Sequence, residues 1–301
     1  MSAAPTTPFG QTIHSRLTAI GLMCAAVSLF ALLDATAKYL VSSKGLPVIE
    51  VVWLRFLVNG LLFFVVISPF ALQRIVRTAR PGHQALRSLF MLGATIFNFA
   101  AVKYLQLDQT VTIFFLTPLL VAALAGPLLG EWVGWRRLLA ILGGFLGVLL
   151  VMRPGFGGIH WAVIFSFCAT LSYAFYNIST RYLASHDPTE VTLFYSPIAG
   201  LILTMPFALM DWVWPADLLT WALLFSMGVL GGAGHWLLIL AHRSAPAPVL
   251  SPFVYVGLVW MIIFGYLLFG DVPSLWTLSG GAVVILSGLY LLARERRKKP
   301  A

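Results

Sequence analysis

The chain has 301 residues, of which 60% are hydrophobic and only 10% are charged. Soluble domains carry roughly 25% charged residues, so this composition excludes an ordinary soluble protein and predicts an integral membrane protein. A net charge of +9 would suit a nucleic-acid partner only if the cations formed one surface.

The apolar residues fall into ten blocks, each close to the roughly 20 residues that a transmembrane helix needs. The blocks cover about 17–40, 48–70, 85–104, 109–129, 136–153, 160–181, 190–210, 217–240, 249–269 and 275–293. The first block is too long for a signal-peptide core, so we expect a retained helix. The sequence therefore predicts an all-α integral membrane protein with ten transmembrane helices and no room for a soluble catalytic domain.

The same landmarks occur twice along the chain, in the same order and at a nearly constant offset. Phe30–Leu40 returns as Tyr173–Leu183, Glu50–Leu61 as Glu190–Leu201, and Leu128–Glu131 as Leu268–Asp271. Because each copy holds five helices, an odd number, the second copy enters the membrane from the opposite face. Inverted repeats of this kind build the central site of many secondary transporters.

The repeat divides the chain into four segments. We expect a disordered cytoplasmic N-terminus (1–15), a first repeat (16–154), a second repeat (155–293) and a basic cytoplasmic tail (294–301). With both termini in the cytoplasm, most arginines and lysines fall on the inner side, as the positive-inside rule requires. This placement accounts for the net charge, argues against a nucleic-acid partner and predicts a multi-pass protein of the cell inner membrane, in contact with lipid.

A set of short motifs accompanies the repeat from about residue 15 to 293. They are Trp53-Leu54-Arg55-Phe56, Lys103-Tyr104, Thr117-Pro118, Leu128-Leu129-Gly130-Glu131, Gly143-Gly144 with Gly147, Tyr176-Asn177, Ala245-Pro246-Ala247-Pro248 and Phe269-Gly270-Asp271. The ordered set resembles the EamA-type family of the drug/metabolite transporter superfamily. Asp271 stands where that family usually has glutamate, which keeps the charge.

The resemblance implies a secondary carrier with a central polar cavity, open alternately to each side. Export of an amino-acid-derived metabolite is the first expectation. The alternative is import of a nucleoside- or vitamin-like solute such as S-adenosylmethionine or riboflavin, and a non-transporting scaffold or an intramembrane enzyme is more distant. The His-Glu-x-x-His, Gly-x-Gly-Asp and phosphate-loop patterns are missing from the sequence, so we expect no catalytic residue, cofactor or metal.

Ionisable groups within the spans cost about 2.5–3.5 kcal/mol each on insertion scales, so each needs an explanation. Asp34 and Lys38 lie four residues apart, acid first, and can pair on one helix face. Alternatively, Asp34 faces the cavity as a proton or cation site. Arg55 can clamp a solute carboxylate, or it can pair with Glu50 or Asp34 in a structural or gating role.

Aromatic and amide side chains in the middle of helices suit an amphipathic or aromatic solute, although each can equally be a packing residue. The candidate cavity residues are Asp34, Lys38, Trp53, Arg55, Asn98, Phe115, Tyr176, Asn177, Tyr195, His235, Trp236 and Tyr255, with Asp34 also the coupling-ion candidate. Thr117-Pro118 and Ser251-Pro252 mark either broken helices at a transport site or simple kinks. Glycine pairs spaced by four, such as Gly228 and Gly232, mark either a homodimer face or close packing within one bundle.

Overall fold

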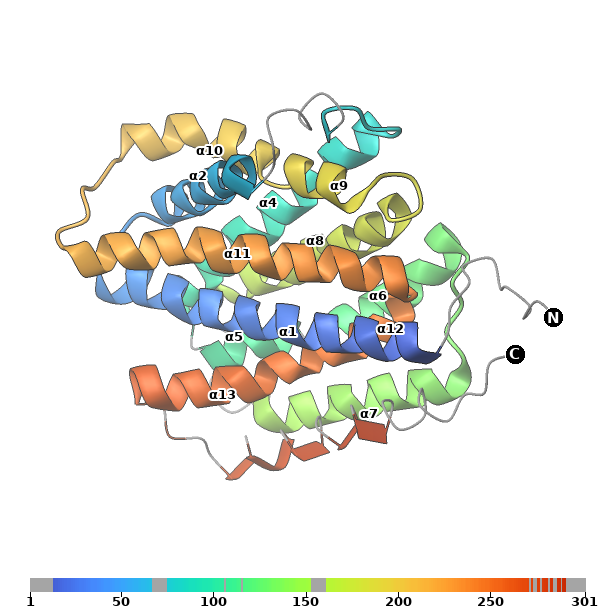
Figure 1. Ribbon diagram of the computed structural model, residues 1–301. Coiled ribbons are helices and arrows are strands. Elements are labelled where there is room, and N and C mark those ends of the chain that lie inside the picture. The colour runs from blue at the N-terminus through green and yellow to red at the C-terminus, as the bar shows by residue number, and fades with distance from the viewer. Residues whose placement is uncertain are drawn as a thin grey trace.

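The computed structural model describes residues 13–66, 75–105, 107–114, 116–152 and 161–270, and scattered positions from 272 to 290. The helices are α1 (Ile13–Lys38), continued by a π-helical turn (Tyr39–Ser43), α2 (Val48–Val66), α4 (Pro81–Tyr104), α5 (Leu107–Phe114), α6 (Thr117–Leu129), α7 (Trp135–Met152), α8 (Val163–Leu183), α9 (Thr189–Tyr195), α10 (Ile198–Met210), α11 (Leu218–Ser244), α12 (Ala247–Leu250), a 3₁₀ turn (Ser251–Tyr255) and α13 (Val256–Phe269). Figure 1 shows these helices running alongside one another in one bundle.

Six helical stretches are long and apolar enough to cross a membrane. They are Arg16–Ser43, Pro81–Tyr104, Val163–Leu183, Thr189–Met210, Leu218–Ser244 and Ala247–Phe269. The expected tenth span, 275–293, is described only at scattered positions. The chain is therefore an all-helical, multi-pass membrane protein within the described residues, and the count of ten helices stays a prediction.

Two expected spans are broken at corresponding places in the two halves. The first separates α5 from α6, and the second replaces one continuous helix by α12, the 3₁₀ turn and α13. Pro118 and Pro252 each stand in the first turn of the segment that follows, where proline's missing N–H costs no helical hydrogen bond. A third break, between α9 and α10 at Ser196-Pro197, was not expected, because 190–210 was predicted as one span.

The helix ends after these breaks share one geometry. Gly130 caps α6 and Gly270 caps α13, both with φ of 71°, a left-handed conformation that glycine adopts without strain. In Figure 1 α6 and α13 run toward opposite ends of the bundle. The repeated sequence therefore folds into a repeated structural unit.

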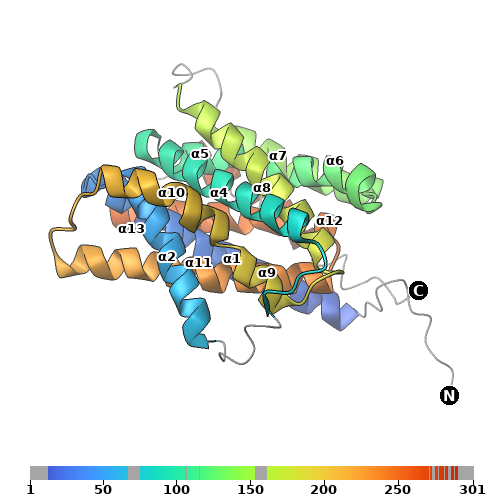
Figure 2. The same cartoon turned by 90° about the horizontal axis from the view of Figure 1, so that it is seen from above.

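Helices of the two halves interlock rather than stand apart. α1 packs along α11 and α4 packs along α8, and these are the two most extensive helix pairs in the described structure. Figure 2 shows the same bundle from above, with α4 beside α8. Because α1 corresponds to α8 and α4 to α11 in the repeat, the two pairs are equivalent contacts.

The glycine at 228 serves packing inside this bundle. A Cβ atom there would lie 2.4 Å from Val58 Cβ on α2, which is too close for any side chain, so glycine is required for α11 to approach α2. This glycine therefore serves packing within the chain, and a homodimer face stays a prediction.

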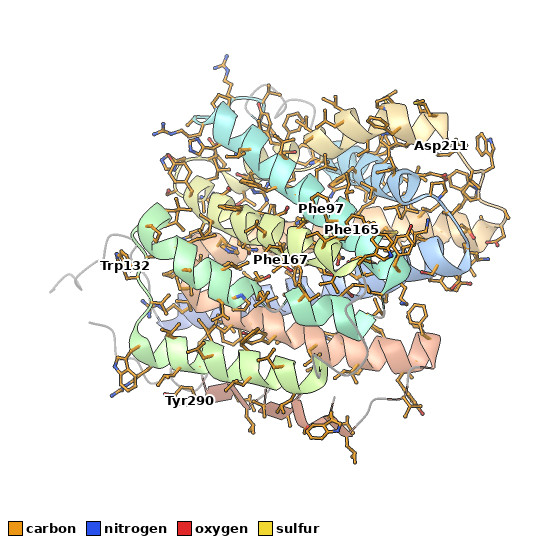
Figure 3. All side chains as sticks on the ribbon, turned by 180° about the vertical axis from the view of Figure 1, so that it is seen from behind. Phe97, Trp132, Phe165, Phe167, Asp211 and Tyr290 are labelled. Carbon is orange, nitrogen blue, oxygen red and sulfur yellow. The ribbon has the colours of Figure 1, made fainter. Side chains whose placement is uncertain are left out.

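Figure 3 shows Trp132 and Asp211 at opposite ends of the bundle.

Candidate functional site

A cavity lies where the two halves meet. Its wall takes residues from α1, α2, α4, α5, α8, α11, the 3₁₀ turn and α13, and its polar side chains are Asp34, Arg55, Thr95, Asn98, Thr110, Tyr173, Tyr176 and His235. Phe30, Phe99 and Phe114 also line it, and the rest of the wall is mostly aliphatic. The cavity encloses about 90 Å³, well below the roughly 300–1,000 Å³ of sites that hold drug-sized ligands. The helices must therefore separate before a solute of that size can enter.

Asp34 enters the wall from α1 and does not pair with Lys38. Its Oδ1 accepts a hydrogen bond of 2.8 Å from Asn98 Nδ2 on α4. Lys38 lies one turn further along α1 and donates to the Leu105 carbonyl oxygen at 2.9 Å, with its ammonium 5.5 Å from the Phe269 ring centroid. The structure thus places the acid in the cavity and its expected partner outside it.

Arg55 reaches the cavity from α2 and is only 3% exposed. Nη1 donates to Thr95 Oγ1 at 2.5 Å, and Nη2 lies 3.0 Å from His235 Nε2. Its Nε has no hydrogen-bond partner in the described structure. Among the described residues no carboxylate comes within ion-pairing distance of this guanidinium, so the expected alternative of a structural pair with Glu50 or Asp34 is not what the structure shows.

The partners of His235 fix the position of its proton. An arginine only donates, so Nε2 must accept from Arg55 and the neutral ring carries its hydrogen on Nδ1. Nδ1 then donates to Tyr176 Oη at 2.8 Å, which also accepts from Arg87 Nη2 at 2.7 Å. A buried chain of hydrogen bonds therefore runs from Arg55 to Arg87 across four helices.

Three expected cavity residues make their contacts elsewhere. Asn177 lies on the same helix as Tyr176 but donates to the Tyr173 carbonyl oxygen at 2.7 Å. Tyr255 packs against α7, where its hydroxyl donates to the Ile141 carbonyl oxygen at 3.2 Å. Trp53 meets Trp212 edge to face, with ring centroids 6.0 Å apart. None of these three lines the cavity wall, because their helix faces point into other contacts.

Three further expected residues lie away from the cavity wall or outside the described residues. Tyr195 donates to the Val76 carbonyl oxygen at 2.8 Å, in an exposed position. Trp236 is 49% exposed, because it lies about 100° around the helix from His235. Phe115 lies outside the described residues. Thr95 and Thr110 line the wall and were not expected there.

Contacts between the halves close the end of the bundle nearer to Trp132. Arg181 Nε donates to Glu131 Oε1 at 2.7 Å, and Glu131 Oε2 accepts from the Ala247 backbone N–H at 2.9 Å. In the same region Asp187, between α8 and α9, accepts from the Ala79 backbone N–H at 2.8 Å and from Gln84 Nε2 at 2.9 Å. Burial alone would raise the pKa of Asp187, but these hydrogen bonds and one from Thr78 outweigh it and hold the pKa below its ordinary value.

An exposed contact joins the halves at the other end. Lys44 Nζ and Asp217 Oδ2 are 2.8 Å apart. The hydrogen bond from Lys44, with those from Thr220, lowers the pKa of Asp217 to about 2, and the same contact raises the pKa of Lys44. Exposed pairs contribute little to stability, so this contact by itself holds that end only weakly.

Comparisons with known proteins agree with this architecture. The profile of the EamA-like transporter family matches residues 17–153 and again 160–294. The chain is similar to a riboflavin transporter of Vibrio cholerae (27% identity over 95% of this chain and 96% of that protein) and to an S-adenosylmethionine uptake transporter of Rickettsia conorii (26%, over 95% and 96%). A pseudopaline exporter of Pseudomonas aeruginosa is 24% identical over 93% of this chain and 97% of that protein.

A solved crystal structure shares the fold. It superposes with a TM-score of 0.70 at 18% sequence identity and covers 95% of this chain and 99% of its own. At that identity the likeness concerns the fold alone.

Proposed function

The chain belongs to the EamA-like transporter family, and on that premise we propose that it carries a small zwitterionic solute with an attached ring across the cell inner membrane by alternating access. The family and its named relatives are transporters, so the chain is not an enzyme. In the proposal ten helices form two inverted halves with both termini in the cytoplasm, and the cavity at Asp34 and Arg55 is the solute site.

The observation that carries the proposal is the incomplete set of contacts made by the buried Arg55 guanidinium. A buried guanidinium is costly unless an anion or hydrogen bonds compensate it, and this one has an unpartnered Nε and makes no ion pair with a carboxylate among the described residues. A solute carboxylate would supply that anion through charge-assisted hydrogen bonds. Asp34, in the same wall, would take the solute's cationic group.

The rest of the wall supports a ring on the solute. Phe30, Phe99, Phe114 and Tyr173 present aromatic faces to the cavity, and such faces bind flat heterocycles by stacking. A solute in which an ammonium and a carboxylate group are joined to a ring fits both expected classes, the amino-acid-derived metabolite and the nucleoside-like solute. Uptake is the second candidate direction, and the likeness to the S-adenosylmethionine uptake transporter of Rickettsia conorii supports it.

In this mechanism the contacts at one end of the bundle break while those at the other end form. The Glu131–Arg181–Ala247 contact closes the end that we assign to the cytoplasm and would separate when that end opens. Asp34 is also the proposed coupling site: a proton and the solute's cationic group compete for its carboxylate, which links proton movement to solute movement.

Counterflow in proteoliposomes tests the proposal. The purified full-length protein is loaded with unlabelled S-adenosylmethionine, and uptake of labelled S-adenosylmethionine or riboflavin is followed. We expect counterflow of the zwitterionic probe, at least about tenfold lower in Arg55→Ala because one or more charge-assisted hydrogen bonds are lost. Arg80→Ala, on an exposed arginine, is the control.

Wild-type counterflow in an Arg55→Ala protein that is inserted and folded would remove Arg55 from the solute site. Absence of S-adenosylmethionine counterflow, or equal counterflow of riboflavin, which has no carboxylate, would contradict the proposed solute class. Direction is read in cells, since a strain without an exporter accumulates the solute while a strain without an importer starves for it.

A further inference from the structure

Arg87 is a second buried arginine near the cavity, and no pattern in the sequence predicts it there. It lies two turns into α4 and is 0% exposed. It does not line the cavity, because Tyr176 stands between them: the guanidinium carbon is 4.5 Å from the Tyr176 ring centroid.

Hydrogen bonds to α8 and to α9 with the residue that follows it fix the position of Arg87. Nε donates to Thr180 Oγ1 at 2.8 Å on α8, and Nη1 donates to Ser196 Oγ at 2.7 Å and to the Thr192 carbonyl oxygen at 3.3 Å on and beside α9. No carboxylate pairs with it among the described residues. Its remaining contact, from Nη2 to Tyr176 Oη, is the one that leads toward the cavity.

Tyr176 passes this constraint on to His235. Its hydroxyl oxygen accepts from both Arg87 and His235 Nδ1, which uses both of its lone pairs. Held there, Tyr176 gives the buried Nδ1–H an acceptor, and the imidazole then turns the lone pair of Nε2 toward Arg55. Without that acceptor the other tautomer becomes available, and its Nε2–H would oppose the N–H groups of Arg55.

We propose that Arg87 is a positioning residue for the solute site: from outside the cavity it holds Tyr176 and, through Tyr176 and His235, aims Arg55 at the solute's acidic group. This inference rests on the proposed function, because it assigns Arg55 to a solute carboxylate. It adds a residue that never touches the solute yet sets the affinity for one part of it.

Two substitutions isolate the connection. Arg87→Met removes every donor of Arg87 at similar length. The Thr180 and Ser196 hydroxyls lose Arg87 as a donor but keep their own acceptors, since Thr180 donates to the Tyr176 carbonyl oxygen and Ser196 to the Thr192 carbonyl oxygen. Tyr176→Phe removes only the connecting hydroxyl. Ser88→Ala is the matched control, because Ser88 is buried on α4 and bonds the Ser196 carbonyl oxygen and the Ala199 N–H. Among the described residues it makes no hydrogen bond with Arg87, Tyr176 or His235, so it tests a perturbation beside Arg87 that leaves the connecting hydroxyl in place.

The first test needs no solute. Nitrogen-15 NMR of histidine-labelled full-length protein in nanodiscs, with His235 assigned by His235→Gln, reports which ring nitrogen carries the proton. We expect protonated Nδ1 in the wild type and in Ser88→Ala, and a mixture of tautomers in Arg87→Met and in Tyr176→Phe. Wild-type His235 signals in Arg87→Met would overturn the proposal.

The second test measures equilibrium binding of S-adenosylmethionine and of decarboxylated S-adenosylmethionine. We expect each single variant to weaken binding of the carboxylate-bearing probe about tenfold and the double variant to weaken it no further, because both act through one hydroxyl. Binding of the decarboxylated probe should change little. Multiplicative losses, or equal losses for both probes, would indicate a merely structural role and overturn the proposal. If the wild type binds neither probe, the proposed solute class fails, while the NMR test still decides the role of Arg87.

Discussion

The contact at Glu131 offers the sharpest prediction about opening of the bundle. Its two carboxylate oxygens accept separately, one from Arg181 and the other from the Ala247 backbone N–H. Arg181 and Glu131 side chains are only 5% and 15% exposed, so water does not readily replace either bond. Glu131→Gln keeps one acceptor and turns an NH₂ group toward the other donor.

The expected magnitude follows from that loss. Hydrogen bonds to charged groups contribute about 1.5–3 kcal/mol each, so the closed arrangement should lose about 2–3 kcal/mol. At 1.4 kcal/mol per tenfold change, the open fraction rises roughly 30- to 100-fold. A cysteine buried beneath the contact should react faster by the same factor, provided that opening is fast relative to labelling.

Ala174 is the reporter position. It is fully buried and packs with Val121, Ala125 and Ala247, directly beside the contact. Ala174→Cys, with Cys24 and Cys168 changed to serine, is labelled in inside-out vesicles by a membrane-impermeant thiol reagent. Glu190→Gln is the control, because Glu190 is exposed and lies on the same side. An unchanged labelling rate in Glu131→Gln, or an equal increase in Glu190→Gln, would refute the reasoning.

Three further outcomes are expected. Asp34→Asn should lose accumulation driven by a pH gradient, because the amide no longer takes up a proton, yet keep solute exchange with a raised KM, because the amide binds the solute's cationic group less tightly; vesicle uptake with and without the gradient measures this. Gly228→Ala should lower the Tm in detergent, since its Cβ would overlap Val58 and overpacking costs about 1–3 kcal/mol. The pKa of Asp217 is lowered from 3.8 to about 2 by its contacts with Lys44 and Thr220, so the stabilisation is present at neutral pH and is lost as the pH falls from the ordinary value toward the lowered one; the drop in Tm caused by Asp217→Asn should change little from pH 7 to 4 and shrink below it.

Each of these has a contradicting result. Undiminished gradient-driven accumulation in Asp34→Asn would exclude it as the coupling site. Gly21→Ala is the control for the glycine, because a Cβ at Gly21 meets nothing within 4 Å, and an equal effect at both positions would contradict the packing argument. For Asp217→Asn, an effect that already fades between pH 7 and 4 would contradict the lowered pKa.

The repeat in the sequence predicted much of the architecture. Matching motifs located the breaks at Pro118 and Pro252 and the paired glycine caps, because proline and glycine impose backbone geometry locally. The break at Pro197 was missed, since its counterpart in the first half, Leu57, is an ordinary helical residue. Local backbone rules thus gave the outline of the fold.

The cavity was predicted only in part, because position along a helix does not say which face a side chain occupies. Asp34, Arg55, Asn98, Tyr176 and His235 do line it. A stricter use of helical spacing would have separated His235 from its neighbour Trp236, since the buried residues of α11 recur every three or four positions up to 235.

Arg87 could not have been found from its sequence position. It falls at the start of a predicted span, where an arginine ordinarily marks the cytoplasmic interface. The structure begins α4 at Pro81, which carries Arg87 two turns into the bundle. Its partners come from a different half of the chain, and no local pattern encodes them.

The central claim is that two oppositely inserted halves enclose the cavity at Asp34 and Arg55. Trp132 and Val272 occupy corresponding positions after the glycine caps and are similarly exposed, at 78% and 80%. In a cysteine-free protein in intact cells, Trp132→Cys and Val272→Cys are each treated with a membrane-impermeant maleimide. We expect labelling of the cysteine at 272 from outside and protection of the cysteine at 132 until the membrane is permeabilised. Labelling of both from the same side would contradict the account.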